Sequence, residues 1–304
     1  MGRIADAIKK AKDERERRQR TADAIVNMPG AAPAMESLTS NSDAANEPPL
    51  SGSAPNSGST PIPGATEAER FAIGSSAVWD VHPTVVAVME RSSIITEQYR
   101  AARTWLLRRY SPSKMNCVAI TSSLPREGKS VTTANLAAVM AEVRHMNVLA
   151  MDCDFRQCSM AKLFKMPNSP GLSDVLSGRA TLNDAIQRTP LGNLYILTGG
   201  GSRDVNSTEL LASRSAAKVF DEIRERFHYT LVDTPPVQCL SDVGVIGALC
   251  SGIVMVVRMN KTASHVVRQS LHRLQANNLP VLGCIAADCS VKGARYEYDG
   301  KDHN

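Results

Sequence analysis

The sequence has few aromatic residues, no paired cysteine motif and no long apolar run. Aromatic residues make up 4% of its 304 positions. The longest apolar run, from Gly244 to Val257, is shorter than the roughly 20 residues of a membrane-spanning helix, so no transmembrane segment is expected. The seven cysteines form no Cys-x-x-Cys pair and have no histidine at metal-binding spacing. This pattern favours reduced thiols in a cytoplasmic protein over a disulfide scaffold or a zinc site.

The charge is concentrated at the N-terminus. The formal net charge is +5, and residues 1–20 supply much of it. Because the rest of the chain is nearly neutral, a nucleic-acid-binding surface is not expected. Ile4, Ile8 and Ala11 lie at helical spacing among these charges, which predicts a basic amphipathic helix over residues 1–21. Such a helix can be solvated, or it can dock on a partner or a membrane surface, and the sequence leaves both open.

A segment rich in Pro, Ser and Gly follows. Residues 29–64 contain no Lys, Arg or aromatic residue. This composition cannot bury enough apolar surface to offset the entropy lost on ordering. We therefore expect a disordered N-terminal extension, with a flexible linker over residues 22–84 that would span roughly 45 Å.

From about residue 85 onward, short apolar runs alternate with amphipathic stretches. The predicted strands are 117–121, 148–151, 194–197, 230–232, 253–257 and 282–286. The predicted helices are 130–144, 215–227, 240–249 and 264–276. Strands that are apolar throughout and alternate with helices indicate a sheet covered on both faces. The sequence thus predicts an α/β domain over residues 85–290, with a doubly wound, mostly parallel sheet.

A phosphate-binding loop follows the first predicted strand. The stretch Ser123–Ser130, SLPREGKS, fits the P-loop pattern with serine in place of the leading glycine. Lys129 would reach the outer phosphates, Ser130 would ligate magnesium, and backbone N–H groups would hold phosphate oxygens. A solvated lysine at a helix start is the plain alternative, and the strand and helix on either side favour the loop. The expected nucleotide-binding residues here are Ser123, Pro125, Arg126, Glu127, Gly128, Lys129, Ser130 and Val131.

Aspartates end two further apolar strands. Asp152 and Asp154 follow one strand in VLAMDCDFR, and Asp233 ends another in LVDTPP. Ligands of a doubly wound sheet bind beyond the carboxyl ends of its strands, so the three carboxylates should converge on the phosphate loop. Gathered carboxylates repel one another unless a cation joins them, which predicts Mg²⁺ bound with ATP. Alternatively, each aspartate merely caps its own strand or helix.

As a set, SSLPREGKS, VLAMDCDFR and LVDTPP resemble the Walker A, A′ and B motifs of the bacterial tyrosine kinases that govern capsule and exopolysaccharide export. The resemblance covers about residues 90–287 and extends to GLSDVLSG, NLYILTGG and STELLAS. It implies a P-loop NTPase fold with ATP and Mg²⁺ as cofactors. The implied catalytic residues are Lys129, Asp152, Asp154 and Asp233, and the implied metal-binding residues are Ser130, Asp152 and Asp233.

The same resemblance implies a role for each acidic residue. Asp152 would act as base or metal partner near the incoming tyrosine, Asp154 would support it, and Asp233 would orient metal-bound water. Arg156 would bind the carboxylates or a phosphate, and it completes the expected nucleotide site. Because the family's last strand often ends in an asparagine that reads adenine, Ala287 in this chain leaves the adenine preference open.

Two further stretches resemble the parts by which the family's subunits associate. In EQYRAAR, Glu97, Arg100 and Arg103 match the family's self-association motif, although plain i,i+3 ion pairs would explain the same spacing. The family's substrate tyrosines lie in a C-terminal cluster, which corresponds to Tyr296 and Tyr298 here. We expect residues 291–304 to be a mobile tail that carries both tyrosines.

These features predict an ATP-dependent protein-tyrosine kinase. It would phosphorylate its own tail in trans, cycle between ring and monomer, and regulate capsular or exopolysaccharide polymerisation or export. The expected activator is a separate membrane chain-length regulator, which would hold this cytoplasmic protein at the inner face of the membrane. Two alternatives stay open. One is a positioning ATPase of the partition or division-site type, although Leu124 stands at the position of its signature lysine. The other is a nucleotide-dependent switch of the export machinery with little kinase activity, a reading that the sparse tyrosine tail favours.

Overall fold

A computed structural model describes residues 79–109, 117–201 and 206–289. The predicted N-terminal helix, most of the predicted linker and the two tail tyrosines lie outside these ranges. Trp79 stacks on Phe164 with 5.4 Å between ring centroids, and Val81 is buried in the core. Packing therefore includes residues ahead of position 85, and the boundaries of the domain stay predictions. Within the described ranges, no helix has the length and apolar character that crossing a membrane requires.

A seven-stranded sheet forms the centre of the fold, in the order β3-β4-β2-β5-β1-β6-β7. Its strands are β1 Cys117–Ser122, β2 Val148–Asp152, β3 Ile186–Arg188, β4 Leu194–Leu197, β5 Tyr229–Asp233, β6 Gly252–Arg258 and β7 Val281–Ala287. All neighbouring pairs are parallel except β3 and β4. The predicted doubly wound, mostly parallel sheet is confirmed, and the short antiparallel edge strand β3 is an addition to it.

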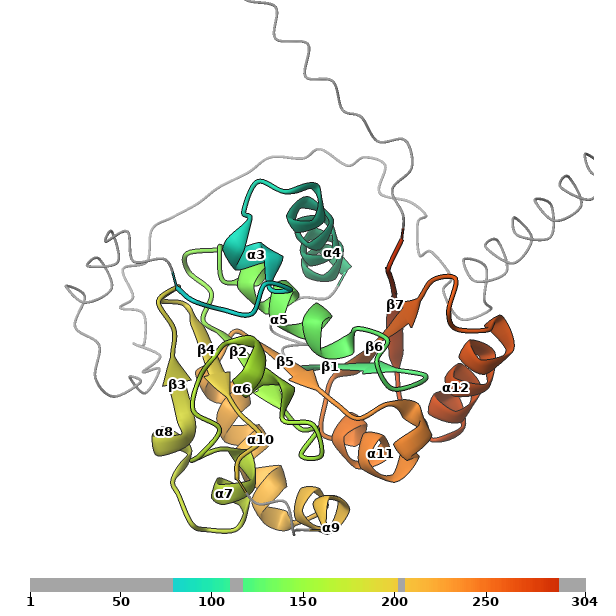
Figure 1. The fold of residues 1–304 in the computed structure, drawn as a ribbon. Helices are drawn as coiled ribbons and strands as arrows, with labels where there is room; N and C mark the ends of the chain where they lie inside the picture. The colour runs from blue at the N-terminus through green and yellow to red at the C-terminus, as the bar shows by residue number, and fades with distance from the viewer. Residues whose placement is uncertain (1–78, 110–116, 202–205, 290–304) are drawn as a thin grey trace, which may run out of the picture. The chain divides into compact units, whose positions relative to one another are not determined.

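Helices cover both faces of this sheet (Figure 1). One face carries α3 Val86–Met89, α4 Ile94–Arg109, α5 Lys129–Met140 and α6 Ser159–Leu163. The other carries α7 Leu172–Leu176, α8 Leu182–Ala185, α9 Ser207–Leu211, α10 Arg214–Arg226, the 3₁₀ turn Val237–Cys239, α11 Leu240–Ala248 and α12 Ser264–Ala276. The helix predicted over 130–144 ends earlier, at Met140, and the other predicted helices lie within one residue of their expected bounds.

The central strands are mostly apolar because each of them faces two cores. Successive side chains of a strand point to opposite faces of the sheet. In β1, Val118 and Ile120 pack beneath α3, α4 and α5, whereas Cys117 and Ala119 pack against the helices of the other face. All six residues of β1 are buried. A strand with one polar face could not occupy this position without burying unpaired polar groups.

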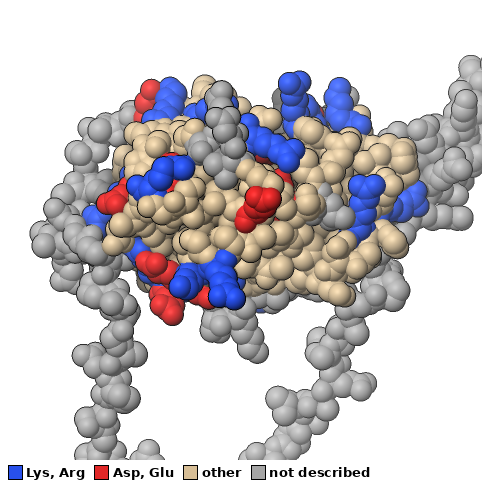
Figure 2. Space-filling view, turned by 90° about the horizontal axis from the view of Figure 1, so that it is seen from below, with Lys and Arg blue, Asp and Glu red and all other residues tan. Residues whose placement is uncertain are grey.

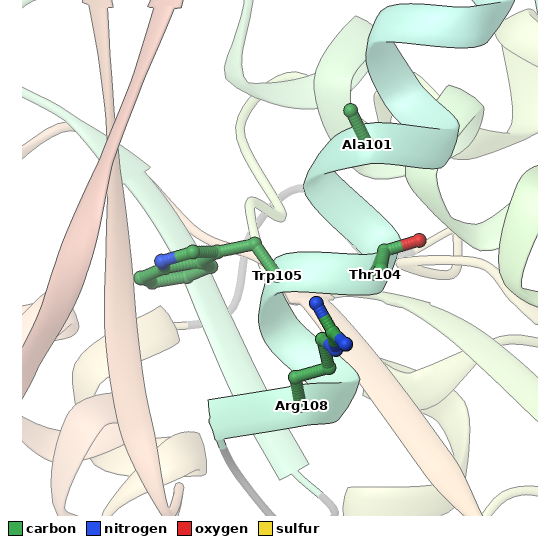
Figure 3. Close-up of a pocket in the computed structure, with 4 residues that line it drawn as sticks. All are labelled: Ala101, Thr104, Trp105 and Arg108. Carbon is green, nitrogen blue, oxygen red and sulfur yellow. The ribbon is translucent and has the colours of Figure 1, made fainter.

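At the β7 edge, the indole of Trp105 lies against the sheet (Figure 3). Ala101, Thr104, Trp105 and Arg108 of α4 line a pocket there. A Cβ atom at Gly283 of β7 would lie 2.7 Å from the Trp105 ring. Glycine at position 283 therefore allows the aromatic ring to approach the strand backbone. On the face shown in Figure 2, basic and acidic side chains are dispersed between broad areas of other residues.

Candidate active site

The loop between β1 and α5 has the backbone of an anion-binding site. Gly128, the residue before α5, has φ +95°, a left-handed conformation that glycine adopts without strain. No side chain caps the N-terminus of α5. The first N–H groups of α5 are therefore open to an oxygen ligand, as in phosphate-binding loops. Ala287, at the end of β7, lies beside this loop, 3.8 Å from the position of a Cβ on Gly128.

Side chains of the loop divide into those that support it and those that are open to a ligand. The carboxylate of Glu127 is buried and accepts hydrogen bonds from the Leu124 N–H, at 2.9 Å, and from the Thr262 hydroxyl. Glu127 thus holds the loop closed, and only its backbone is free for the predicted nucleotide contact. The Ser123 hydroxyl is also buried, but it has no hydrogen-bond partner among the described residues.

Parallel pairing of β2 with β5 brings two of the predicted aspartates together. Asp152 and Asp233 are register partners on these adjacent strands, and both side chains are fully buried. Adjacent strands are about 4.8 Å apart, so the carboxylates face each other at close range. Lys129 and Asp154 complete the group, with 3.0 Å between Nζ of the lysine and Oδ2 of the aspartate. The structure therefore brings Lys129 and all three predicted carboxylates together.

Hydrogen bonding differs between the two facing carboxylates. Asp152 is well held, because its Oδ1 accepts from the Asp154 N–H at 3.0 Å and its Oδ2 from the Met160 N–H at 2.9 Å. Neither oxygen of Asp233 has a fully formed hydrogen bond among the described residues, although the Ser130 hydroxyl lies close enough to lower its pKa. A buried acceptor without a partner costs about 1–3 kcal/mol, more when it is charged. Asp233 is therefore poised for a further ligand.

Burial controls the protonation of this group. Desolvation and the neighbouring Asp233 raise the pKa of Asp152 to about 8. Desolvation also raises the pKa of Asp233, and Lys129 partly offsets this effect. Burial disfavours the Lys129 ammonium, but the Asp233 and Asp154 carboxylates outweigh it and raise the pKa of Lys129. Lys129 thus stays charged, while Asp152 can hold a proton near neutral pH.

Arg156 does not contact the carboxylates that it was predicted to bind. Its guanidinium lies 3.2 Å from Oδ2 of Asp242 on α11. Asp242 is buried and also accepts a hydrogen bond from the Thr208 hydroxyl of α9. Asp242 was missed from the sequence because its partners are 34 and 86 positions away along the chain. It fixes α9 and the loop after β2 onto α11.

The predicted self-association residues are paired within the chain. Arg100 contacts Glu97 at 2.5 Å and Glu142 at 2.5 Å, and Arg103 contacts Glu142 at 2.9 Å. Arg103 also donates to the Val139 carbonyl at 2.5 Å. Glu142, just beyond the end of α5, therefore joins α4 to the helix that follows the phosphate loop. No local pattern marked Glu142 as the partner of this motif.

The described residues contain no group of three or more His, Cys, Asp or Glu side chains arranged to hold a metal by themselves. The predicted magnesium ligands, Ser130, Asp152 and Asp233, include only two carboxylates. This composition suits Mg²⁺, which usually takes one or two carboxylates and completes its shell with water and substrate phosphates. The predicted phosphorylation sites, Tyr296 and Tyr298, lie outside the described residues.

Comparison with known proteins supports a common family. A family model described as an AAA domain matches residues 115–278. Tyrosine-protein kinase YwqD of Bacillus subtilis (strain 168) is 32% identical over 221 residues, which cover 72% of this chain and 92% of YwqD. The chain belongs to the bacterial tyrosine kinase family. Its fold matches the kinase domain of Escherichia coli tyrosine kinase ETK with a TM-score of 0.63 and 28% identity, over 68% of this chain and 82% of that domain.

Relatives of this bacterial tyrosine kinase differ in length. The succinoglycan biosynthesis transport protein ExoP of Rhizobium meliloti (strain 1021) is 31% identical over 69% of this chain. The chain spans only 27% of ExoP. The two proteins therefore share a segment that is about a quarter of ExoP's length.

Proposed function

We propose that this chain is an ATP- and Mg²⁺-dependent protein-tyrosine kinase that phosphorylates its own tail and regulates capsular or exopolysaccharide polymerisation or export. The observation that carries the proposal is the facing pair Asp152 and Asp233 beside Lys129, at the mouth of a phosphate-type loop. Similarity to YwqD and ETK supports tyrosine as the acceptor. The match to ExoP, a succinoglycan biosynthesis transport protein, supports a role in polysaccharide assembly.

The side chains present fit a magnesium nucleotide. Asp233 has two buried carboxylate oxygens, and Ser123 a buried hydroxyl, that lack hydrogen-bond partners among the described residues. Ser130, Asp152 and Asp233 would hold the ion, and Lys129 with the loop backbone would hold the phosphates. When bound, magnesium supplies positive charge that neutralises both the phosphates and the facing carboxylates.

Asp152 is placed to act as the base for tyrosine. A tyrosine hydroxyl has an ordinary pKa near 10, so it must lose its proton as its oxygen attacks the γ-phosphorus. The anchored Asp152 carboxylate, which the positive charge of bound magnesium would keep ionised, accepts that proton, and the bond from the γ-phosphorus to the ADP oxygen breaks. General-base help of this kind contributes about 10²- to 10⁴-fold. Asp154 keeps the lysine ammonium in the site.

Self-association and an external activator complete the proposal. We propose that Glu97, Arg100 and Arg103 contribute to a ring of subunits, in which each offers Tyr296 or Tyr298 to its neighbour. A separate membrane chain-length regulator would activate the kinase and hold it at the inner face of the membrane. Nucleic acid has no part in this proposal.

Phosphotyrosine on the purified protein after incubation with MgATP tests the proposal, with and without a cytosolic peptide of the candidate regulator. We expect labelling at Tyr296 or Tyr298 that disappears in Lys129→Met, since the methionine cannot hold the phosphates. Thermal unfolding of the variant without nucleotide is measured in parallel to show that it still folds. ATP hydrolysis without phosphotyrosine, even with the regulator peptide, would refute the kinase and favour a positioning ATPase or a nucleotide-dependent switch.

A further inference from the structure

A second pocket lies next to the carboxylates, and its charged lining is basic. It has a volume of about 290 Å³ and lies between the loop after β2, helix α6 and the backbone of Gly200 and Gly201. Arg156 and Lys162 line it, and none of its described lining residues is acidic. Its apolar lining residues are Phe155, Ala161 and Met166. The pocket thus combines an apolar part with positive charge, a combination suited to an acidic peptide.

This pocket lies near Asp152, the proposed base. A Cβ at Gly199 would lie 3.0 Å from Sγ of Cys158, which lines the pocket, and 3.8 Å from Cγ of Asp152. Asp152 also accepts the N–H of Met160, the residue before Ala161 in α6. Gly199 therefore lies close both to a lining residue of the pocket and to the reacting carboxylate. A peptide bound in the pocket would therefore place its neighbouring residues close to the loop that follows Asp152.

The positive charge of the pocket is only partly neutralised by the described residues. Lys162 is exposed, and its Nζ donates to the backbone carbonyl of Gln157 at 3.1 Å. No described carboxylate forms an ion pair with Lys162. Arg156 is paired with Asp242, yet its side chain is 59% exposed and a guanidinium has five donors. Both cations can therefore bind a further carboxylate.

The tail of the chain has the matching pattern. Residues Tyr296, Glu297, Tyr298 and Asp299 alternate between a potential acceptor and an acid. Alternate side chains of an extended peptide point to opposite sides. A tyrosine directed at Asp152 would therefore direct the following acidic residue away from the repelling carboxylates. There the acidic residue can bind the basic pocket lined by Arg156 and Lys162.

We propose that the pocket lined by Arg156 and Lys162 is an acceptor subsite, which binds the carboxylate that follows the target tyrosine in the tail of a second copy. This inference rests on the proposed kinase activity and adds a sequence preference to it. Glu297 would fill the subsite when Tyr296 is the acceptor, and Asp299 when Tyr298 is. Lys162 is a specificity residue in this proposal, because it touches the substrate away from the reacting atoms.

A charge-swap experiment tests the subsite. The enzyme is the full chain with Tyr296→Phe and Tyr298→Phe, so that its own tail does not compete. The substrates are synthetic peptides of residues 291–304 with Tyr298→Phe, carrying either the natural Glu297 or Glu297→Lys. We expect Lys162→Glu to raise KM for the natural peptide roughly 3- to 10-fold, as loss and reversal of partly exposed charge pairs would give. The reversed peptide should restore KM on this variant, while kcat and the KM for MgATP stay unchanged.

Lys218→Glu is the matched control, since Lys218 is an exposed lysine on α10, across the sheet from α6. It undergoes the same charge change and should leave KM for both peptides as in the parent enzyme. Lys129-dependent labelling of the natural peptide with an unchanged KM in Lys162→Glu would overturn the subsite and leave the kinase standing. A raised KM that the reversed peptide does not restore would also overturn it. Absence of any Lys129-dependent labelling would overturn the proposed kinase activity together with the subsite.

Discussion

The facing carboxylates at the ends of β2 and β5 should destabilise the protein when no cation is bound. Burial raises the pKa of Asp233 from 3.8 to about 6. A shift of about 2 pKa units corresponds to roughly 3 kcal/mol against the ionised folded state. The sign follows from linkage: a folded-state pKa above the unfolded value means that ionisation costs stability. This cost is absent below pH 3.8, grows between the two values, and is complete above about pH 6.

Asp233→Asn removes this cost and should therefore stabilise the unliganded protein. The new amide is itself buried without a fixed partner, which costs about 1–3 kcal/mol. The net gain at pH 8 is then up to about 2 kcal/mol, which corresponds to a rise in Tm of at most roughly 4–8 °C for a domain of this size. At pH 4.5 most of the carboxylate cost has gone and the amide cost remains, so the variant should be no more stable than the wild type. Phosphotyrosine formation should be lost at either pH.

Thermal unfolding of both proteins at pH 4.5 and pH 8, without nucleotide, checks this reasoning. Asp154→Asn is the matched control, because it makes the same chemical change within the same group of carboxylates but breaks the buried pair with Lys129. It should lower Tm, since removing one partner of a buried ion pair costs about 3–5 kcal/mol. A Tm at pH 8 that falls in Asp233→Asn, or a gain that does not shrink at pH 4.5, would refute the proposed cost of burying the ionised Asp233 carboxylate.

Two further substitutions test contacts outside the carboxylate group. Glu142→Gln should lower the free energy of unfolding by about 1–2 kcal/mol at pH 7, because it weakens partly buried contacts with Arg100 and Arg103. Since the hydrogen bond from Arg100 lowers the pKa of Glu142, this difference should shrink as the pH falls below about 4 in urea unfolding curves. Gly283→Ala should cost about 1–3 kcal/mol by crowding Trp105, and a Trp105→Ala background should remove most of that cost. If the changes in the free energy of unfolding of Gly283→Ala and Trp105→Ala simply add in the double variant, the two residues are not in contact.

The central fold was predictable because its signal is local. Strands buried on both faces give unbroken apolar runs, and β2, β4 and β6 were found within one or two residues of their bounds. The edge strand β3, IQR, is only half-buried and has no such run, so no hydrophobic pattern marked it. The helix after the phosphate loop was predicted to reach Arg144, but it ends at Met140, and Glu142 and Val143 donate to carbonyls three positions earlier, as in a turn.

The candidate site was predictable to the extent that topology fixes it. Parallel strands end at one edge of a sheet, so Asp152 and Asp233 had to approach each other once the strands β2 and β5 were recognised. The contacts that hold the neighbouring side chains are of another kind. Arg156 pairs with Asp242, which is 86 positions away in the sequence, and Arg100 pairs with Glu142, which is 42 positions away. Such pairs depend on how helices pack on the sheet, which no local spacing encodes.

Glu127 shows that a side chain of this loop has a supporting role that residue type alone does not predict. From the sequence, its place inside the phosphate loop predicts contact with the nucleotide. In the structure, its carboxylate faces inward onto the Leu124 N–H and the Thr262 hydroxyl. An anion beside bound phosphates would repel them, whereas an inward carboxylate satisfies a buried donor and leaves the outer surface of the loop to N–H groups. The Glu127 side chain thus favours phosphate binding indirectly, because it holds the loop backbone whose N–H groups would bind the phosphates.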